Sequence, residues 1–210
     1  MDVRMFTVGA FQENCYLVRP DGAAKALLID PGDEAERLQA AMSELGVEPE
    51  AILLTHTHID HIGAVAPIAR ATGVPVYCPR AELTILAQPD RFFPPAWGSV
   101  EGWEAEQPLD GGERLQLAGL DIEVVSTPGH SPGHVTYVID GGLFSGDVLF
   151  QSSIGRTDLP GADHATLMAS IATLLERFDD DATVHPGHMG LTTLGRERAT
   201  NPFLQALAGR

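Results

Sequence analysis

The chain has 210 residues, of which 44% are hydrophobic, so it is long enough for a single domain over residues 1–210 with a substantial core. Its 29 acidic residues outnumber 13 basic ones, and the net charge of −16 argues against nucleic acid as a partner, which would require a cationic surface. No apolar run reaches the roughly 20 residues that span a membrane, the first residues lack a secretory pattern, and there are only two cysteines, so a cytoplasmic protein without disulfides or membrane contact is expected.

In the first half of the chain, apolar periodicity and turn residues predict strands that alternate with helices. The predicted strands are Val3–Val8, Asn14–Val18, Lys25–Ile29, Ala51–Leu54 and Val74–Cys78. The predicted helices are Asp33–Leu45, with Asp33 as N-cap and Gly46 as stop, then Ile59–Ala71, ended by Gly73, and a short helix Arg80–Leu86.

The segment Gln88–Gly112 has no clear periodicity. It contains four prolines and four large aromatic residues, including Phe93 and Trp97. A long loop in a compact domain is often functional, so this segment either borders a substrate site or is a surface loop packed on its own aromatic side chains.

The second half repeats the alternation. Strands are predicted over Arg114–Leu117, Asp121–Ser126, Val135–Ile139, Leu143–Phe144 and Ala182–His185, and helices over Ala165–Phe178 and Leu194–Leu207. Two such halves predict an α/β fold in which two sheets pack face to face with helices outside, a four-layer αββα sandwich.

The sequence His56-Thr57-His58-Ile59-Asp60-His61 directly follows a short apolar strand. In an extended segment residues two apart point to one side, so His56 and His58 are placed to bind one ion together. Asp60 and His61 fall at the start of the next helix and offer a second pair of ligands. Imidazole and carboxylate are the donors that borderline divalent metals prefer, so this segment predicts a metal site.

Three further residues sit in turns after later strands. His130 follows Thr127-Pro128-Gly129, Asp147 follows Gly146, and His188 follows Pro186-Gly187. Turns at strand ends are where rigid scaffolds place reactive side chains, so these residues are expected to complete the metal site.

Together these motifs resemble the metallo-β-lactamase superfamily of metallohydrolases over essentially the whole chain. The resemblance implies two metal sites: His56, His58 and His130 for the first ion, Asp60, His61 and His188 for the second, and Asp147 as the bridge between them. Zinc is favoured, and iron and manganese accept the same donors.

The segments Thr127–His134 and Gly155–Asp158 are similar to the glyoxalase II-like branch, in its compact bacterial form. Asp147 distinguishes the chain from class B3 lactamases, which lack the bridging Asp. Arg156 falls about where that branch places a lysine that contacts glutathione, which implies a substrate-binding role. The longer C-terminal helical region of the glyoxalase II enzymes is not matched, so glutathione specificity stays open.

The resemblance implies hydrolysis of a small thioester such as S-lactoylglutathione, with a hydroxide shared by the two ions as nucleophile and Asp60 orienting it or carrying its proton. Two alternatives remain at this point: a persulfide dioxygenase with one iron, and a metal-binding module without catalysis. A closed set of four ligands is typical of a structural site, and seven shared ligands favour catalysis.

Other polar residues receive structural roles. His134 is expected to have a supporting or structural role and Asp30 to hold a ligand histidine or the turn backbone in place. His185 is expected to pack near its turn, and His164 to lie at the surface or to cap a helix start.

Overall fold

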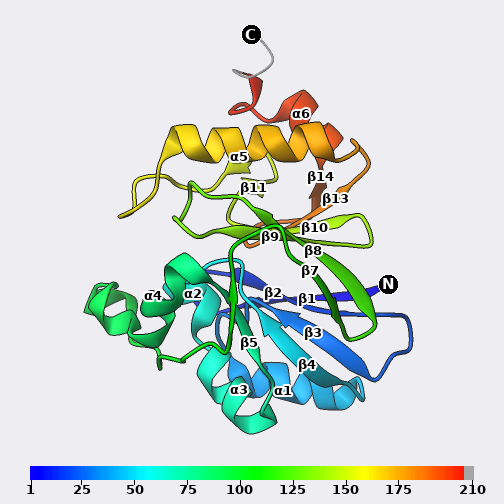
Figure 1. Ribbon diagram of the computed structural model, residues 1–210, viewed down its shortest axis with the longest axis vertical. Coiled ribbons are helices and arrows are strands. Elements are labelled where there is room, and N and C mark those ends of the chain that lie inside the picture. Colours follow the sequence, from blue (N-terminus) through cyan, green and yellow to red (C-terminus); the bar gives the residue numbers. More distant parts are fainter. Residues whose placement is uncertain (206–210) are drawn as a thin grey trace.

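A computed structural model describes residues 1–205, in which two mixed sheets pack face to face with helices on both outer surfaces (Figure 1). The first sheet has the order β1-β2-β3-β4-β5-β6, antiparallel from β1 to β3 and parallel from β3 to β6. Its strands are β1 (Asp2–Val8), β2 (Glu13–Arg19), β3 (Lys25–Ile29), β4 (Glu48–Leu53), β5 (Val76–Pro79) and β6 (Gln107–Leu109).

The second sheet has the order β14-β13-β10-β9-β8-β7, in which only β10 and β13 are parallel neighbours. Its strands are β7 (Arg114–Leu117), β8 (Leu120–Ser126), β9 (Val135–Ile139), β10 (Gly142–Gly146), β13 (Thr183–Pro186) and β14 (Thr192–Thr193). A small antiparallel pair, β11 (Leu149–Phe150) and β12 (Ser153–Ile154), lies between β10 and the next helix in the chain.

The helices form the outer layers. They are α1 (Ala35–Glu44), α2 (Ile59–Ile62), α3 (Val65–Thr72), α4 (Leu83–Ala87), α5 (His164–Arg177) and α6 (Leu194–Thr200), together with the 3₁₀ helices η1 (Arg80–Glu82), η2 (Pro89–Arg91) and η3 (Pro95–Trp97). Helices α1 and α3 cover the first sheet, and α5 covers the second (Figure 1). The predicted four-layer αββα sandwich is therefore confirmed.

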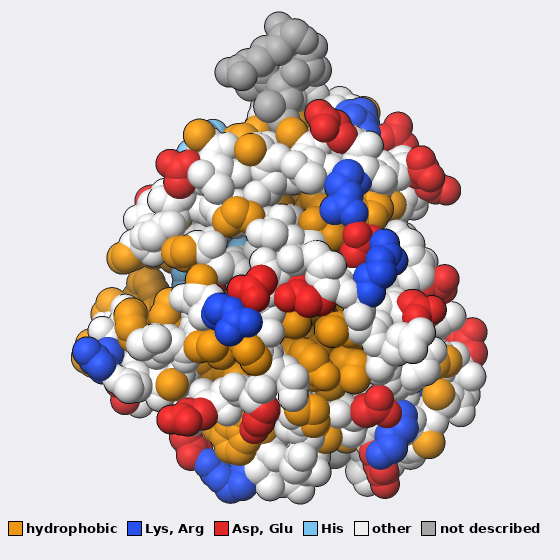
Figure 2. All heavy atoms as spheres, viewed as in Figure 1, with side chains coloured by type: hydrophobic (Ala, Val, Ile, Leu, Met, Phe, Trp, Pro, Cys, Tyr) orange, Lys and Arg blue, Asp and Glu red, His pale blue; other side chains and the backbone are white. Residues whose placement is uncertain are grey.

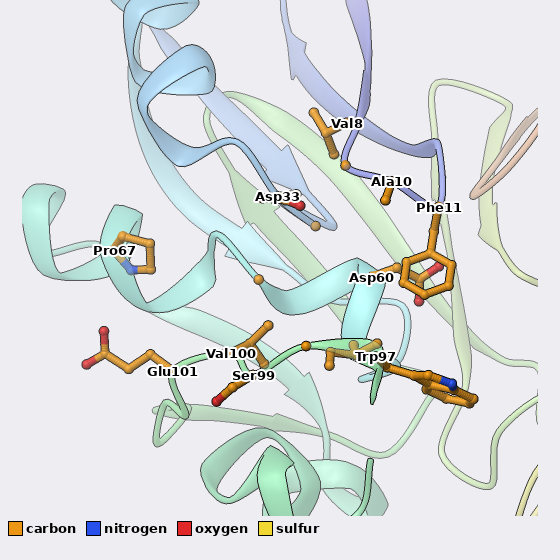
Figure 3. A pocket seen from close by; sticks show the side chains of 15 residues that line it. Val8, Ala10, Phe11, Asp33, Asp60, Pro67, Trp97, Ser99, Val100 and Glu101 are labelled. Carbon is orange, nitrogen blue, oxygen red and sulfur yellow. The ribbon is translucent and has the colours of Figure 1, made fainter. Parts of the chain in front are cut away.

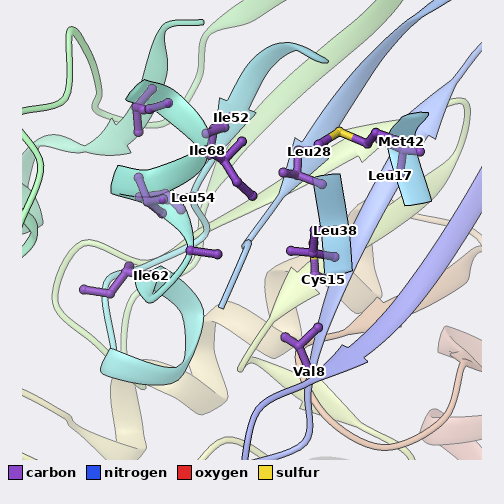
Figure 4. Close-up of a cluster of buried hydrophobic side chains, with 14 of the residues drawn as sticks. Val8, Cys15, Leu17, Leu28, Leu38, Met42, Ile52, Leu54, Ile62 and Ile68 are labelled. Atoms are coloured by element: carbon purple, nitrogen blue, oxygen red, sulfur yellow. The ribbon is translucent and has the colours of Figure 1, made fainter. Parts of the chain in front are cut away.

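The direction of the side chains alternates along each strand, because successive residues point to opposite faces of a sheet. This alternation produces the layers of the fold. In β2, Leu17 packs toward α1 and α3 (Figure 4), whereas Tyr16 packs between the two sheets. In β10, Phe144 joins the core between the sheets and Leu143 packs toward α5. Each central strand is thus buried on both faces. This packing fixes the position of the strand ends and of the turns that follow them.

The predicted helix Ile59–Ala71 is divided in the structure. It ends as α2 at Ile62 and resumes as α3 at Val65. A side chain at Gly63 would collide with the Gly32 carbonyl, and the Ala64 N–H donates to the Pro31 carbonyl oxygen at 3.0 Å. The Asp30-Pro31-Gly32 turn therefore packs so closely against this segment that the helix is interrupted between Ile62 and Val65.

Two other predicted helix ends are wrong. Glu34, whose backbone is in the left-handed region, precedes α1. Within residues 1–205 the Asp33 carboxylate accepts a hydrogen bond only from the Glu34 N–H, so it does not cap the helix. The last helix, expected to reach Leu207, ends at Thr200, and residue 207 lies outside the described residues. The segment Gln88–Gly112 contains a strand that was not predicted, β6, which pairs with β5.

None of the helices within residues 1–205 is long and apolar enough to cross a lipid bilayer. On the face shown in Figure 2, basic side chains are separated from one another by acidic, polar and apolar ones.

Candidate metal centre

The residues singled out in the sequence lie at one edge of the sandwich, where strands from both sheets end. The segment from His56 to His61 follows β4 and runs into α2. His130 follows β8, Asp147 follows β10 and His188 follows β13. Strand ends of two packed sheets meet at this edge, and the fold brings all seven predicted ligands together there.

The first group consists of three imidazoles. The Nδ1 atom of His58 lies 3.1 Å from Nε2 of His56 and 2.7 Å from Nε2 of His130. These three nitrogens lie within 4.8 Å of one another, close enough to share one ion. Burial lowers the pKa of His56 well below its usual range and that of His58 to about 3, so both rings are neutral near pH 7, as a metal ligand must be.

The second group consists of Asp60, His61 and His188, whose ligand atoms also lie within 4.8 Å of one another. The Asp60 carboxylate is 3.2 Å from Nε2 of His188. Burial opposes the charged form of His61, but the carboxylates of Asp147 and Asp60 outweigh it and raise the pKa of His61. This group is richer in negative charge than the first and is suited to hold a cation.

Asp147 lies between the two groups. Its Oδ1 atom is 3.4 Å from Nε2 of His61, and its Oδ2 atom is 3.3 Å from Nε2 of His130 and 3.6 Å from Nε2 of His188. The side chain is almost fully buried. Burial alone would raise the pKa of Asp147, but His61 and the other neighbouring histidines lower it well below its usual range. This carboxylate therefore contacts the nitrogens that face the site in both histidine sets.

Two buried atoms test whether the arrangement fits metal ions. Nε2 of His61 and Oδ1 of Asp147 are both buried, and neither has a hydrogen-bond partner among residues 1–205. An unpaired buried polar atom is costly, and a cation between these atoms would satisfy both. The residues therefore fit divalent metals that accept imidazole and carboxylate ligands.

In the buried ligand candidates His56, His61 and His130, the ring nitrogen Nδ1, which faces away from the site, contacts another group. Nδ1 of His61 lies 3.1 Å from Asp30, and Nδ1 of His56 lies 3.0 Å from the Thr55 hydroxyl, which itself donates to Asp30 at 2.6 Å. Nδ1 of His130 donates to the Arg156 carbonyl oxygen at 2.8 Å. When the ring is neutral, each bond holds the proton on this nitrogen and leaves the lone pair of the nitrogen that faces the site available for a metal. The orienting role predicted for Asp30 agrees with these contacts.

The remaining histidines lie outside the ligand groups. Nε2 of His134 accepts a hydrogen bond from the Asp147 N–H at 3.2 Å, so this ring supports the backbone of Asp147, which agrees with the predicted supporting role. His185 stacks on Phe144 with ring centroids 4.4 Å apart, which agrees with the predicted packing role. His164 is the exposed first residue of α5, behind its N-cap Asp163.

Glu13 is a buried acid beside the site that the sequence did not indicate. Its Oε1 atom lies 3.7 Å from Nδ1 of His61, and neither carboxylate oxygen has a hydrogen-bond partner among the described residues. Burial raises the pKa of Glu13 well above its usual range. Its one sequence signal is an acidic residue directly before a predicted strand, which is too common to predict a site.

A cavity of about 340 Å³ opens over the two groups. His58, Asp60, His130, Asp147 and His188 line it together with mainly apolar residues, namely Phe11, Ile59, Trp97, Phe150, Ile154, Leu159 and Met189. Trp97 comes from the irregular segment Gln88–Gly112, so this segment does border the cavity. A second cavity of about 320 Å³ shares the side chains of Phe11, Asp60 and Trp97 with the first (Figure 3).

Arg156 also lines the first cavity. Its guanidinium donates to both carboxylate oxygens of Asp158, from Nε at 2.7 Å and from Nη2 at 2.8 Å. This guanidinium lowers the pKa of Asp158 to about 2. The Arg156 side chain is 58% exposed, so the cation is at the rim of the cavity but already has an anionic neighbour.

Comparison with known proteins agrees with this geometry. A family model described as the metallo-beta-lactamase superfamily matches residues 8–188. The chain is 38% identical to the hydroxyacylglutathione hydrolase GloC of Haemophilus influenzae, over 98% of this chain and 99% of that protein. Among solved structures, it is 45% identical to TTHA1623 in a di-iron-bound form, with a TM-score of 0.85 over 96% of this chain and 100% of that one. The BLEG-1 B3 metallo-beta-lactamase is 38% identical, with a TM-score of 0.91 over 97% of this chain and 99% of that one.

Proposed function

This chain belongs to the metallo-beta-lactamase superfamily, and from that membership we propose that it is a hydrolase that uses two metal ions to cleave a small thioester. The observation that carries the proposal is the position of Asp147, within 3.6 Å of a histidine from each ligand group. A single ion of the kind that accepts imidazole ligands, such as zinc, does not use seven ligands, whereas two ions that share one carboxylate can.

We assign His56, His58 and His130 to the first ion and Asp60, His61 and His188 to the second, with Asp147 between them. When bound, two divalent ions of this kind activate a water molecule near neutral pH and polarise a carbonyl group. The solved di-iron form of TTHA1623 supports the count of two ions. Zinc remains the favoured metal on the donor set, with iron or manganese as alternatives.

Asp60 is the proposed proton carrier. Its side chain lines the cavity and lies beside His188, so its carboxylate can orient an attacking water and accept the proton that the water loses. Burial would raise the pKa of Asp60, but His61 and His188 lower it, so the carboxylate is ionised near pH 7 and free to accept. The two cysteines are buried in the core, so neither offers a thiolate to the cavity.

The choice of a thioester rests on two observations. The hydroxyacylglutathione hydrolase GloC aligns over nearly its whole length with this chain. The cavity is lined mainly by apolar side chains, which suit the acyl and thioether carbons of a thioester. Arg156 at its rim is the proposed contact for a substrate carboxylate.

The test combines metal analysis with substrate hydrolysis. We expect close to two metal ions per chain when the protein is fully loaded, and turnover of S-lactoylglutathione. A β-lactam serves as the comparison substrate, because a class B3 lactamase is among the similar structures. One iron per chain with oxygen consumption on a persulfide would identify a dioxygenase instead. Full metal loading without turnover of any thioester would refute the thioester hydrolase.

A further inference from the structure

Glu82 is a buried acid that the proposed chemistry does not use. It is the last residue of the 3₁₀ helix η1, directly after β5, and only 1% of it is exposed. Its carboxylate accepts four hydrogen bonds, all from uncharged groups. Burying a carboxylate without a cation is costly, and four donors offset that cost only while all of them are held in place.

The two carboxylate oxygens bind two different loops. Oε2 accepts from the N–H of Thr57 at 2.6 Å and from its hydroxyl at 2.9 Å. Oε1 accepts from the N–H of Gly133 at 3.0 Å and from the Ser131 hydroxyl. One loop follows β4 in the first sheet, and the other follows β8 in the second.

Both loops carry candidate ligands of the first ion. Thr57 stands between His56 and His58, and Ser131 directly follows His130. The loops also pack closely on the Glu82 side chain, because a Cβ at Gly133 would lie only 2.8 Å from Cγ of Glu82. Within residues 1–205, Glu82 therefore accepts hydrogen bonds from neighbours of all three imidazoles and from none of the imidazoles themselves.

We propose that Glu82 is a positioning residue that sets the spacing of the first metal site by joining its two ligand loops across the sheets. The inference rests on the proposed metal assignment of His56, His58 and His130. Glu82 is outside the ligand set. Under this proposal the affinity of the first site for its ion depends on Glu82, whereas the affinity of the second site does not.

The chemistry of the four donors explains why a carboxylate is required. Each oxygen of Glu82 faces one hydroxyl, which can also accept, and one backbone N–H, which cannot. In Glu82→Gln the amide group must turn its NH₂ toward one of the two loops. Whichever loop it faces, a buried backbone N–H loses its acceptor, so one loop is released while the side-chain volume is kept.

The experiment compares metal binding by full-length variants loaded with Co²⁺. A chelator is titrated against each protein while the visible spectrum and the metal content are followed. We expect Glu82→Gln to release one of its two ions at a chelator concentration about tenfold lower than the wild-type chain does, because groups that orient ligands commonly contribute 10- to 100-fold in affinity. The second ion and its spectrum should stay as in the wild type.

Glu197→Gln is the matched control. Glu197 is also fully buried and accepts from the Ser152 N–H, the Thr192 hydroxyl and the Asn201 amide. Unlike Glu82 it also has a charged neighbour, the Arg196 guanidinium at 3.4 Å, and it has no hydrogen bond to either ligand loop within residues 1–205. It should lose thermal stability and keep wild-type affinity for both ions. If Glu82→Gln behaves in the same way, Glu82 only stabilises the fold and the proposal is overturned.

Ser131→Ala decides the matter if Glu82→Gln does not fold. It removes one donor on the His130 side and should weaken the same ion by a smaller factor. Unchanged affinity for both ions in Ser131→Ala would overturn the proposal. A wild-type chain that binds no ion would overturn the proposed function itself, whereas two ions held equally by wild type and variants would overturn only the role of Glu82.

Discussion

Replacing Arg156 by alanine should raise KM for anionic thioesters about tenfold and leave KM for neutral thioesters nearly unchanged. The guanidinium uses two of its five N–H groups on Asp158, so three remain for a substrate carboxylate. One charge-assisted hydrogen bond at an exposed rim corresponds to about a factor of ten in affinity. The effect should fall in high salt, because the side chain is more than half exposed.

Asp158, the partner of Arg156, provides a second test of substrate binding by Arg156. Asp158 competes with the substrate for Arg156, and exposed ion pairs are weak, so Asp158→Asn should lower KM for anionic thioesters by about two- to threefold. If the pair only ties the loop, both variants should instead damage turnover alike.

The assay measures kcat and KM for one anionic and one neutral thioester. It compares the wild-type chain, Arg156→Ala, Asp158→Asn and the double variant that carries both substitutions. Metal content and thermal stability are measured on each protein as controls. Equal losses for charged and neutral substrates, or a loss that follows thermal stability, would refute substrate binding by Arg156.

Three further predictions concern the site and its support. Asp147→Ala should weaken both metal sites and abolish turnover, and a variant with two ions and near-normal rate would contradict the bridging role. The pKa of His58 is lowered to about 3, whereas an unfolded histidine titrates near 6.5. The unfolded chain therefore binds the extra proton first as pH falls, and the metal-free protein should lose about 1.4 kcal/mol of stability per pH unit from this group between roughly pH 6.5 and 3, as measured by denaturant unfolding. Tyr137→Phe removes the buried hydroxyl that donates to the Leu54 carbonyl oxygen at 2.6 Å, and it should lower the free energy of unfolding by about 1–3 kcal/mol without changing metal content.

The gathering of the ligand candidates could be predicted because each one follows a strand. A buried strand fixes the position of the turn after it, so His130, Asp147 and His188 were placed by their sequence neighbours alone. The layers were predictable for a similar reason, since the apolar pattern of each strand is local information.

Asp30 and His134 were expected to support the site, but the supporting roles of Glu82 and of the Arg156 carbonyl group could not be predicted, because their partners are distant in the sequence. Glu82 resembles a solvated acid at a helix end, and only the approach of two loops from different sheets makes it a buried acceptor. Arg156 was singled out for its side chain, yet its carbonyl oxygen orients His130, a role that any residue type could fill. The break at Gly63 likewise depends on the turn at Gly32, while the local apolar pattern continues through it.

The candidate ligands divide between the halves of the chain, with four in residues 56–61 and three from His130 onward. Under the proposed assignment, each ion would act as a removable cross-link between segments that meet only in the folded protein. A ligand that binds only the folded state adds stability with the logarithm of its concentration, about 2.7 kcal/mol per site at a hundredfold excess over Kd. The lifetime of this protein in a cell would then follow the supply of metal, because a starved chain unfolds and is degraded more often.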